Sequence, residues 1–325
     1  MRAWRVDRQG EPSEVLSLTD MPVPEPGPGQ IRVRMTAAGI GLPDVLMCRH
    51  TYPLTPSGPF TPGQEGTGVV SAVGPDVDMA LGTKVMSTTS FMEGSGSFAE
   101  EFLAPARSSF TVPSGLSDID AAGFWIPHLT AWIGLVDRAR LEPNQRLAVI
   151  GAAGGSGIAA VQLGRALGAR VIAIVSDEAR AEFCRGLGAD ETINHRDGDL
   201  ASRLRRMTGG LGVDVVYDPA GGPVAEEAAT ALARYGRFLA VGFASGAWAR
   251  INTVNLVVTN TSLVGVYAGD YSRDELDAIH SELSDLVSSG RLQNTVTTRV
   301  PFGDLPSALQ RLADRSVIGK MVMVP

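Results

Sequence analysis

The chain has 325 residues, of which 44% are hydrophobic and 19% are charged, and its formal net charge is −7. The length predicts about two domains, and the composition is that of a globular protein in solution. The acidic balance, without a block of like charges, argues against a broad nucleic-acid-binding face and against docking on an acidic membrane.

The two cysteines, Cys48 and Cys184, are too few for a disulfide framework and are typical of a reducing compartment. The first residues lack the apolar core of a signal peptide. No apolar run approaches the roughly 20 residues that span a bilayer. We therefore expect a cytoplasmic protein without a membrane segment.

Before residue 120 the chain is rich in proline and carries short apolar runs, such as residues 31–35 and 68–73. Runs of this kind, punctuated by glycine and proline, predict strands in a loop-rich, mainly β region. The prolines between residues 22 and 28 predict a stiff connector.

From about residue 122 the pattern changes to short buried strands that alternate with helices. Strands are predicted over residues 146–150, 170–175 and 213–217, and a helix is predicted over 178–188. Continuous apolar strands that alternate with helices indicate parallel βαβ units with both faces covered.

The last stretch contains a capping box, Ser272 with Glu275 three residues later, which predicts the start of a helix. Gly290 marks the expected end of this helix. A helix around 305–312 and a strand over 321–324 are predicted to close the chain. The apolar residues of the capped helix recur at helical spacing: Leu276, Ile279, Leu283 and Leu286.

The strongest local signal is the run Gly-Ala-Ala-Gly-Gly-Ser-Gly at residues 151–157, between a predicted strand and a predicted helix. Glycines here let the backbone approach a pyrophosphate, and a helix N-terminus offers free N–H groups with a partial positive charge. Ala152 replaces the first glycine of the strict G-x-G-x-x-G pattern, so a tight turn that binds nothing is the alternative. The expected cofactor contacts of this turn are Ala153, Gly154, Gly155, Ser156, Gly157 and Ile158.

The end of the second strand bears on the choice of nicotinamide cofactor. An NAD site usually places Asp or Glu there, where it bonds the ribose 2′-OH. Here Ser176 ends the strand and Arg180 lies one helical turn further on, a pair that suits the 2′-phosphate of NADPH. Asp177 and Glu178 could reach a 2′-OH instead, so NADH remains the alternative.

Further motifs follow one another in a fixed order over nearly the whole chain. They lie at residues 37–40, 62–70, 96–101, 129–132, 152–157, 215–218 and 319–322. Together they resemble the medium-chain dehydrogenase/reductase superfamily, specifically its zinc-free quinone oxidoreductase (zeta-crystallin-like) branch.

The resemblance implies an α/β protein of two domains. Residues 1–121 and 263–325 would form a GroES-like, mainly β catalytic domain, and residues 122–262 a Rossmann domain with a doubly wound parallel sheet. The resemblance also implies a homodimer that pairs edge strands near residues 255–266.

Zinc-dependent members of the superfamily carry a Cys just after the Ala-Gly-Ile segment and a His in a Gly-His-Glu triplet. Here Gly41 and Gln64 stand at these positions, and the four-cysteine zinc lobe is missing. Since zinc needs three or four convergent N, S or carboxylate ligands, no metal site is expected. Cys48 and His50 are close in sequence, but we expect them to pack or to face solvent.

The resemblance also implies residues of the substrate and cofactor sites. Tyr52 matches a recurring cleft tyrosine, whose phenol could bond a developing enolate or hydroquinone oxygen. Asp44 matches a recurring acidic position. A packing tyrosine and a loop-sealing aspartate are the alternatives. The implied cofactor contacts outside the glycine turn are Thr130, His195, Val241, Gly242, Phe243 and Lys320.

The sequence thus predicts a zinc-independent, NADPH-dependent reductase that transfers hydride or electrons to quinones or other conjugated carbonyls. Such acceptors delocalise the incoming charge without a Lewis acid. A 2-enoyl thioester (enoyl-CoA/ACP) reductase is the alternative enzyme, and a non-catalytic NADPH-binding structural or regulatory protein is the alternative of another class. The expected partner is a small conjugated carbonyl, not nucleic acid or a membrane.

Overall fold

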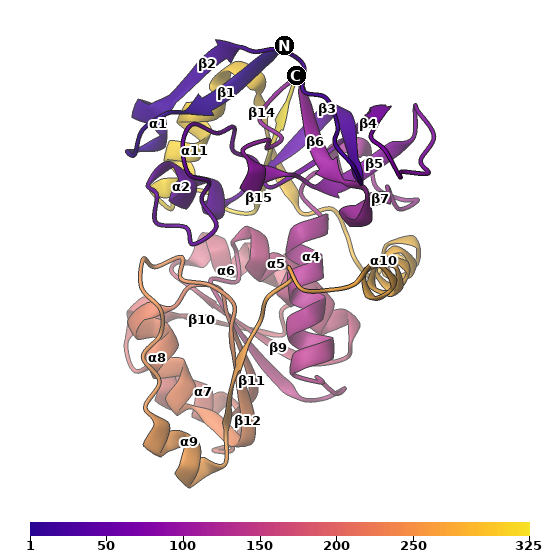
Figure 1. Ribbon diagram of the computed structural model, residues 1–325. Coiled ribbons are helices and arrows are strands. Elements are labelled where there is room, and N and C mark those ends of the chain that lie inside the picture. Colours follow the sequence, from indigo (N-terminus) through magenta and orange to yellow (C-terminus); the bar gives the residue numbers. More distant parts are fainter. The chain divides into compact units, whose positions relative to one another are not determined.

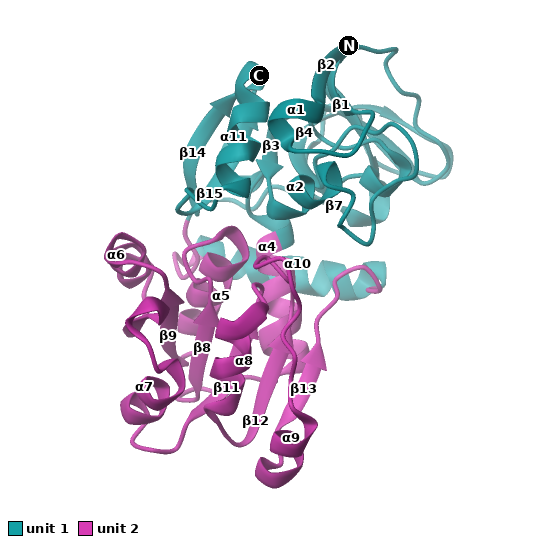
Figure 2. Ribbon diagram, turned by 90° about the vertical axis from the view of Figure 1, so that its left-hand side faces the viewer, with its two compact units in different colours: residues 1–126, 272–288, 294–325 teal, residues 127–271, 289–293 magenta.

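The computed structural model describes residues 1–325, and the chain divides into two compact units (Figure 2). Unit 1 comprises Met1–Ile126, Ser272–Ser288 and Asn294–Pro325, and unit 2 comprises Pro127–Tyr271 and Ser289–Gln293. The chain passes between the units at 126/127, 271/272, 288/289 and 293/294. The expected domain boundaries, at 121/122 and 262/263, stay predictions.

Unit 1 is mainly β, as its alternating runs predict. Its seven-stranded sheet has the order β14-β15-β3-β4-β5-β7, with β6 paired to β3, and β1 and β2 form a separate antiparallel pair. The strands are β1 (Arg2–Val6), β2 (Leu16–Asp20), β3 (Gln30–Ile40), β4 (Glu65–Val73), β5 (Lys84–Thr88), β6 (Glu101–Pro105), β7 (Ser109–Thr111), β14 (Val296–Pro301) and β15 (Lys320–Val324).

The helices of unit 1 include the one that the capping box predicts. Ser272 N donates to Glu275 Oε2 (2.8 Å) and Glu275 N to Ser272 Oγ (3.4 Å), which confirms the box. The buried face ends with Val287, one position after the expected Leu286, which is half-buried. The helices are α1 (Pro12–Val15), α2 (Leu42–Cys48), α3 (Asp118–Ala121), α10 (Arg273–Ser288) and α11 (Leu305–Ala313).

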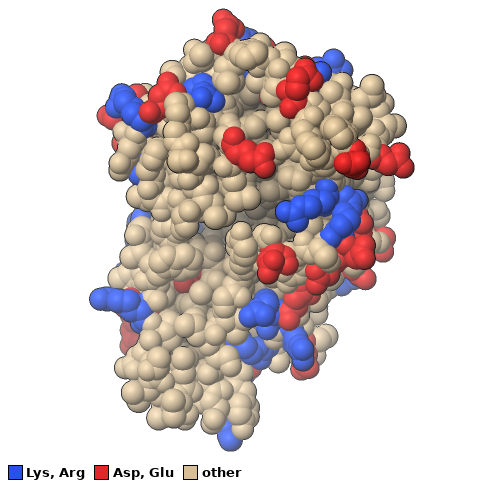
Figure 3. All heavy atoms as spheres, viewed as in Figure 1, with Lys and Arg blue, Asp and Glu red and all other residues tan.

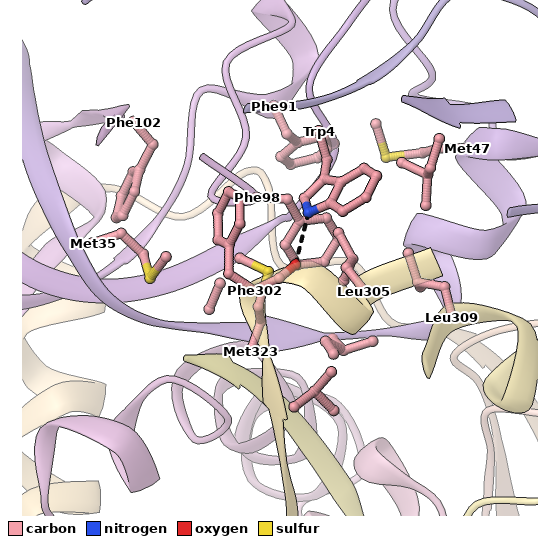
Figure 4. Close-up of a cluster of buried hydrophobic side chains, with 14 of the residues drawn as sticks. Trp4, Met35, Met47, Phe91, Phe98, Phe102, Phe302, Leu305, Leu309 and Met323 are labelled. Atoms are coloured by element: carbon pink, nitrogen blue, oxygen red, sulfur yellow. Dashed lines mark hydrogen bonds between the residues drawn. The ribbon is translucent and has the colours of Figure 1, made fainter. Parts of the chain in front are cut away.

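The core of unit 1 joins the two ends of the chain (Figure 4). Trp4 of β1 packs beside Phe302, and its indole N–H donates to the Phe302 carbonyl oxygen at 2.9 Å. Leu305 and Leu309 of α11 and Met323 of β15 belong to the same buried cluster. The first and last segments therefore fold as one body.

Unit 2 is built on a parallel sheet with the strand order β10-β9-β8-β11-β12-β13. Figure 1 labels β9, β10, β11 and β12 of this sheet. The predicted strands 146–150 and 170–175 are confirmed at their predicted bounds, and the predicted strand 213–217 runs one residue further. The strands are β8 (Arg146–Ile150), β9 (Arg170–Val175), β10 (Glu191–Asn194), β11 (Val213–Asp218), β12 (Leu232–Ala240) and β13 (Ser262–Gly265).

Helices cover this sheet as a doubly wound fold requires. Apolar residues of α7 and α8 share one buried cluster with Ile172, Ile174 and Val216 of the sheet, while α5 packs on β8 and β9. Helix α6 ends at Gly186, two residues before the predicted end. The helices are α4 (Trp125–Trp132), which begins in unit 1, α5 (Gly155–Ala166), α6 (Glu178–Gly186), α7 (Leu200–Met207), α8 (Gly222–Thr230) and α9 (Thr253–Thr259).

Each unit carries one cysteine. Cys48 of α2 and Cys184 of α6 are free and have no exposed surface. Burial raises the pKa of both thiols to about 12. His50, the neighbour of Cys48, faces solvent, as expected.

No helix combines the length and the apolar character that crossing a membrane requires. On the face seen in Figure 3, acidic and basic side chains stand side by side, and no wide field of one sign covers it.

Candidate functional site

Most of the expected dinucleotide contacts follow strands of unit 2 at one edge of its parallel sheet; Thr130, in α4, and Lys320, in unit 1, do not. Strands β8, β9, β11 and β12 all run in the same direction, so the loops that follow them emerge at their shared carboxyl edge. The chain proceeds from β8 to β9 on one side, and β11 lies on the other side of β8. Ligands of open α/β sheets bind at such a switch point. The glycine turn follows β8 and therefore lies there.

The turn presents free backbone donors. Gly154 is the N-cap of α5, and the N–H groups of Gly155, Ser156 and Gly157 have no acceptor within the chain. A Cβ on Gly157 would lie 2.3 Å from the Gly151 carbonyl oxygen, so only glycine permits this close turn. Three free N–H groups at the positive end of a 12-residue helix are donors of the kind that bind anions.

The turn also explains its departure from the strict pattern. Gly151 adopts the left-handed conformation (φ +60°) one position before Ala152, so Ala152 needs no such freedom and is fully buried. Ala153 and Ile158 are buried as well, and they hold the turn against the unit. Of the expected contacts, Gly154 is the most open to solvent.

The end of β9 shows an arrangement that the sequence does not reveal. Asp177 caps α6 by accepting the Arg180 N–H at 3.0 Å. The same carboxylate accepts the Ser176 hydroxyl at 2.9 Å and the Arg180 guanidinium at 2.5 Å. The backbone hydrogen bond from Arg180, with these side-chain donors, lowers the pKa of Asp177. Asp177 therefore stays ionised and ties Ser176 to Arg180.

His195 opens a short 3-10 turn, His195–Asp197, directly after β10 at the same edge of the sheet. Its ring is half-buried, and burial together with the nearby Arg196 lowers its pKa. A neutral imidazole at neutral pH follows, which can donate or accept one hydrogen bond but carries no full charge.

Asp218, the last residue of β11, holds two loops of this edge. Its carboxylate accepts the N–H groups of Ala220 and Gly221, and its carbonyl accepts those of Val241 and Gly242. Burial raises the pKa of Asp218 to about 6. Phe243 follows in the second loop and packs on Trp248, with ring centroids 4.9 Å apart. The expected contacts 241–243 are thus anchored next to the switch point.

Thr130 lies in α4, which continues directly into a π-helix, Ile133–Arg138. Single π-helical turns occur frequently at functional sites. Thr130 is half-buried. Its expected contact with the cofactor stays a prediction.

The expected substrate-side residues belong to unit 1. Asp44 is 1% exposed, and its two carboxylate oxygens accept the N–H groups of Gly41 (2.9 Å) and Gly63 (3.0 Å). Burial raises the pKa of Asp44 to about 7, against the lowering effect of these donors and of Lys320. Tyr52 is half-buried at the margin of the core of unit 1. Asp44 thus clamps two loops, while the phenol ring of Tyr52 is partly open.

Lys320 pairs with a residue that sequence reasoning did not select. Its Nζ lies 2.6 Å from Glu65 Oε1, and the two side chains are 6% and 5% exposed. The other oxygen of Glu65 accepts the Ile126 N–H at 3.0 Å. Glu65 belongs to the 62–70 motif, but the motif does not identify its partner, because Lys320 lies 255 residues away in the chain.

The positions of the zinc ligands hold no ligand set. Gly41 has no side chain, and Gln64 is buried with its amide near the Met47 sulfur (3.7 Å). No group of three or more His, Cys, Asp or Glu side chains is placed so that it could hold a metal ion. Glycine and glutamine at these two positions are not among the Cys, His and carboxylate side chains that bind zinc.

Comparison with known proteins identifies the family. The family model of the alcohol dehydrogenase GroES-like domain matches residues 27–114, and the zinc-binding dehydrogenase model matches residues 155–285. A 2-haloacrylate reductase from a Burkholderia species is 33% identical and covers 94% of each chain. Quinone oxidoreductase 1 of Escherichia coli is 31% identical and covers 96% of each chain.

Solved structures agree over the full length. The Escherichia coli quinone oxidoreductase complexed with NADPH has a TM-score of 0.90 at 28% identity, and all of both chains is covered. A mycobacterial protein complexed with NADPH has a TM-score of 0.93 at 30% identity, again over both whole chains. The chain is therefore an oxidoreductase that belongs to the quinone oxidoreductase branch of the medium-chain dehydrogenase/reductase superfamily.

Proposed function

We propose that the protein is a zinc-independent, NADPH-dependent reductase of quinones or other conjugated carbonyls. The observation that carries the proposal is the set of free backbone N–H donors at residues 155–157. They lie at the switch point of the parallel sheet in this chain, a member of the quinone oxidoreductase branch. When bound, NADPH supplies the hydride. The chain's own residues would bind and orient the cofactor and the acceptor and would supply a proton to the reduced acceptor.

Residues of unit 2 would hold the cofactor. The N–H groups of Gly155, Ser156 and Gly157 are suited to the pyrophosphate. Arg180, with Ser176 beside it, is suited to the 2′-phosphate that distinguishes NADPH from NADH. His195 would add one hydrogen bond near this phosphate. The loop 241–243 and Thr130 are proposed to contact the remainder of the cofactor. Lys320, a residue of unit 1, is proposed as a further contact.

In unit 1, Tyr52 is the proposed catalytic residue. Its phenol would donate a hydrogen bond to the oxygen on which charge develops when a conjugated acceptor takes up hydride. Asp44 is better suited to act through the loops that it clamps, because its oxygens are buried and occupied. The class of acceptor is supported by the relatives' names, since quinones and haloacrylates are both conjugated acceptors.

The zinc-independent chemistry is supported by the side chains at the two ligand positions, glycine and a buried glutamine. A conjugated acceptor spreads the charge of the incoming hydride over its own carbonyl, so a Lewis acid is not required. The free, buried Cys48 and Cys184 support a cytoplasmic location, since disulfides are rare there.

We further propose a homodimer. Strand β13 is the last strand of the sheet of unit 2 and leaves one row of backbone groups unpaired. Large apolar side chains in and beside α9 and β13 are exposed at 49–75%: Val254, Val257, Val258, Leu263 and Tyr267. An exposed edge with apolar neighbours is suited to pairing with the same edge of a second copy.

The test is NADPH and NADH oxidation by chelator-treated protein with 1,4-benzoquinone, 9,10-phenanthrenequinone and crotonyl-CoA. Turnover of the quinones with a preference for NADPH is expected. A preference for crotonyl-CoA would instead identify a 2-enoyl thioester reductase. Tight NADPH binding without turnover of any acceptor would overturn the proposal in favour of a non-catalytic binding protein.

A further inference from the structure

Tyr217 is a buried tyrosine at the end of β11, next to the switch point. Its side chain has no exposed surface, and its hydroxyl lies 2.8 Å from Ser156 Oγ in the glycine turn. No other partner of this hydroxyl is present in the chain, and either oxygen of the pair could be the donor. The buried hydroxyl of Tyr217 therefore has one hydrogen-bond partner, the side chain of Ser156 in the glycine turn.

The ring of Tyr217 also contacts the π-helix that continues α4. A Cβ on Gly134 would lie 3.2 Å from Tyr217 Cε2, so the ring packs closely against a residue without a side chain. Gly134 belongs to the π-helix Ile133–Arg138. Tyr217 thus lies between two segments from which cofactor contacts are expected, the glycine turn and the helix that carries Thr130.

Ser156 is the residue through which Tyr217 can act on a ligand. It occupies the first turn of α5, where its backbone N–H is free, and it is only half-buried. A phosphate oxygen at this helix end can accept both the N–H and the O–H of Ser156. In that arrangement Ser156 Oγ accepts the Tyr217 hydroxyl, and the two hydrogen bonds strengthen each other.

We infer that Tyr217 is a positioning residue for the pyrophosphate of the dinucleotide, which it aligns by donating a hydrogen bond to Ser156. The inference rests on the proposed function in that it takes NADPH as the ligand. Burial raises the pKa of Tyr217 well above its ordinary value, so the phenol keeps its proton and remains a donor. The sequence alone gives no signal for this pair, because 61 residues separate its members.

The experiment is a double-mutant cycle with Tyr217→Phe, Ser156→Ala and the double variant. Calorimetry gives the Kd of NADPH, ADP and adenosine for each protein. Tyr217→Phe keeps the ring and should weaken NADPH and ADP about five- to tenfold, with adenosine unchanged. Because Tyr217 acts through Ser156, the double variant should bind no more weakly than Ser156→Ala alone. In steady state, KM for NADPH should rise while kcat at saturation stays within about twofold.

Tyr235→Phe is the matched control, since it removes a hydroxyl from a tyrosine of unit 2 that is 60% exposed. It should leave all three Kd values unchanged. Unaltered ADP and NADPH affinity in Tyr217→Phe would overturn the inference. A double variant whose Kd rises by the product of the two single effects would overturn it as well. If Tyr217→Phe does not fold, Ser156→Ala decides: unchanged ADP affinity overturns the inference, and a loss confined to ADP and NADPH supports it.

The calorimetric Kd values need no acceptor, so they separate the inference from the proposed function. Wild-type protein that binds NADPH but reduces no acceptor would end the proposed reductase activity and leave the role of Tyr217 intact. If the wild type reduces an acceptor but Tyr217→Phe binds NADPH as tightly as the wild type, the reductase activity stands and the role of Tyr217 is overturned.

Discussion

Lys320 and Glu65, 255 residues apart in the chain, form an ion pair of 2.6 Å with almost no exposed surface. The pair links β15, at the end of the chain, to β4. A buried ion pair contributes little net stability as a whole, but removal of one partner leaves a buried charge without compensation.

Lys320→Met should therefore lower the free energy of unfolding by about 3–5 kcal/mol in urea titrations. The double variant Lys320→Met/Glu65→Gln should recover most of this loss, because neither charge remains. Lys84→Met is the control, since it breaks the exposed pair of Lys84 with Asp118. The control should cost less than about 1 kcal/mol. Equal losses of unfolding free energy in Lys320→Met and Lys84→Met would contradict the prediction that breaking the buried pair costs more than breaking the exposed one.

Asp44 predicts a pH dependence of stability. Its pKa in the folded protein is raised from 3.8 to about 7 by burial, so between these values the folded state binds more protons than the unfolded state. Stability from this group is present at low pH and is lost as the pH rises from about 4 to 7.

Asp44→Asn removes the titrating group, so the variant should lose less stability than the wild type over this window. The difference should be about 4 kcal/mol, because each pKa unit between 3.8 and about 7 corresponds to about 1.4 kcal/mol. Urea unfolding at a series of pH values measures it. Asp118→Asn, a change at a partly exposed aspartate of the same unit, serves as the comparison. Parallel pH profiles for wild type and Asp44→Asn would show that Asp44 does not titrate there.

Arg180 should decide the preference between the two nicotinamide cofactors. Arg180→Ala removes a charged donor from the 2′-phosphate and should raise the Kd of NADPH about tenfold, with NADH changed by less than about twofold. Fluorescence titration of both cofactors measures the effect. Arg185→Ala, on the same helix but paired with Glu178, should change neither. An equal loss for NADPH and NADH would assign Arg180 to structure alone.

Tyr52 should matter for turnover and not for cofactor binding. Tyr52→Phe keeps the ring and should lower kcat with an enone about 10- to 100-fold, since the developing oxyanion loses a donor. Steady-state assays give kcat, and titration should show an unchanged Kd for NADPH. If kcat is unaffected, Tyr52 is a packing residue and the proton comes from elsewhere.

The proposed dimer predicts a monomeric variant. Val258→Glu places a charge on the apolar surface of α9, where the side chain is 70% exposed, and should disfavour pairing of two copies. Sedimentation velocity should show a dimer for the wild type and a monomer for this variant. Leu211→Glu, equally exposed at 69% but outside this surface, should leave the dimer unchanged. A monomeric wild type would refute the dimer.

Elements with a strong local pattern could be predicted from the sequence. The strands β8 and β9 are continuous apolar runs, and they begin and end where predicted. Ser272 and Glu275 lie within one turn, so the helix start that they form is a local property. The glycine turn could be predicted for the same reason.

Features that depend on distant contacts could not be predicted. The partners of Lys320 and Ser156 come from other strands, and nothing near either residue in the sequence selects them. The buried face of α10 ends with Val287, four residues after Leu283, and not with Leu286, three residues after it. Both positions fit helical spacing, so the pattern alone does not choose between them. The sequence predicts Arg180 beside Ser176 but does not reveal that both side chains donate to Asp177.

The two buried thiols allow the local unfolding of each unit to be measured separately. A thiol with a pKa of about 12 is almost entirely protonated at neutral pH and does not react with disulfide reagents until it is exposed. Cys48 marks unit 1 and Cys184 marks unit 2, so their labelling rates measure two separate local unfolding equilibria in one sample. A dinucleotide held by unit 2 should slow the labelling of Cys184 by mass action, which turns an unmodified cysteine into a sensor of cofactor occupancy.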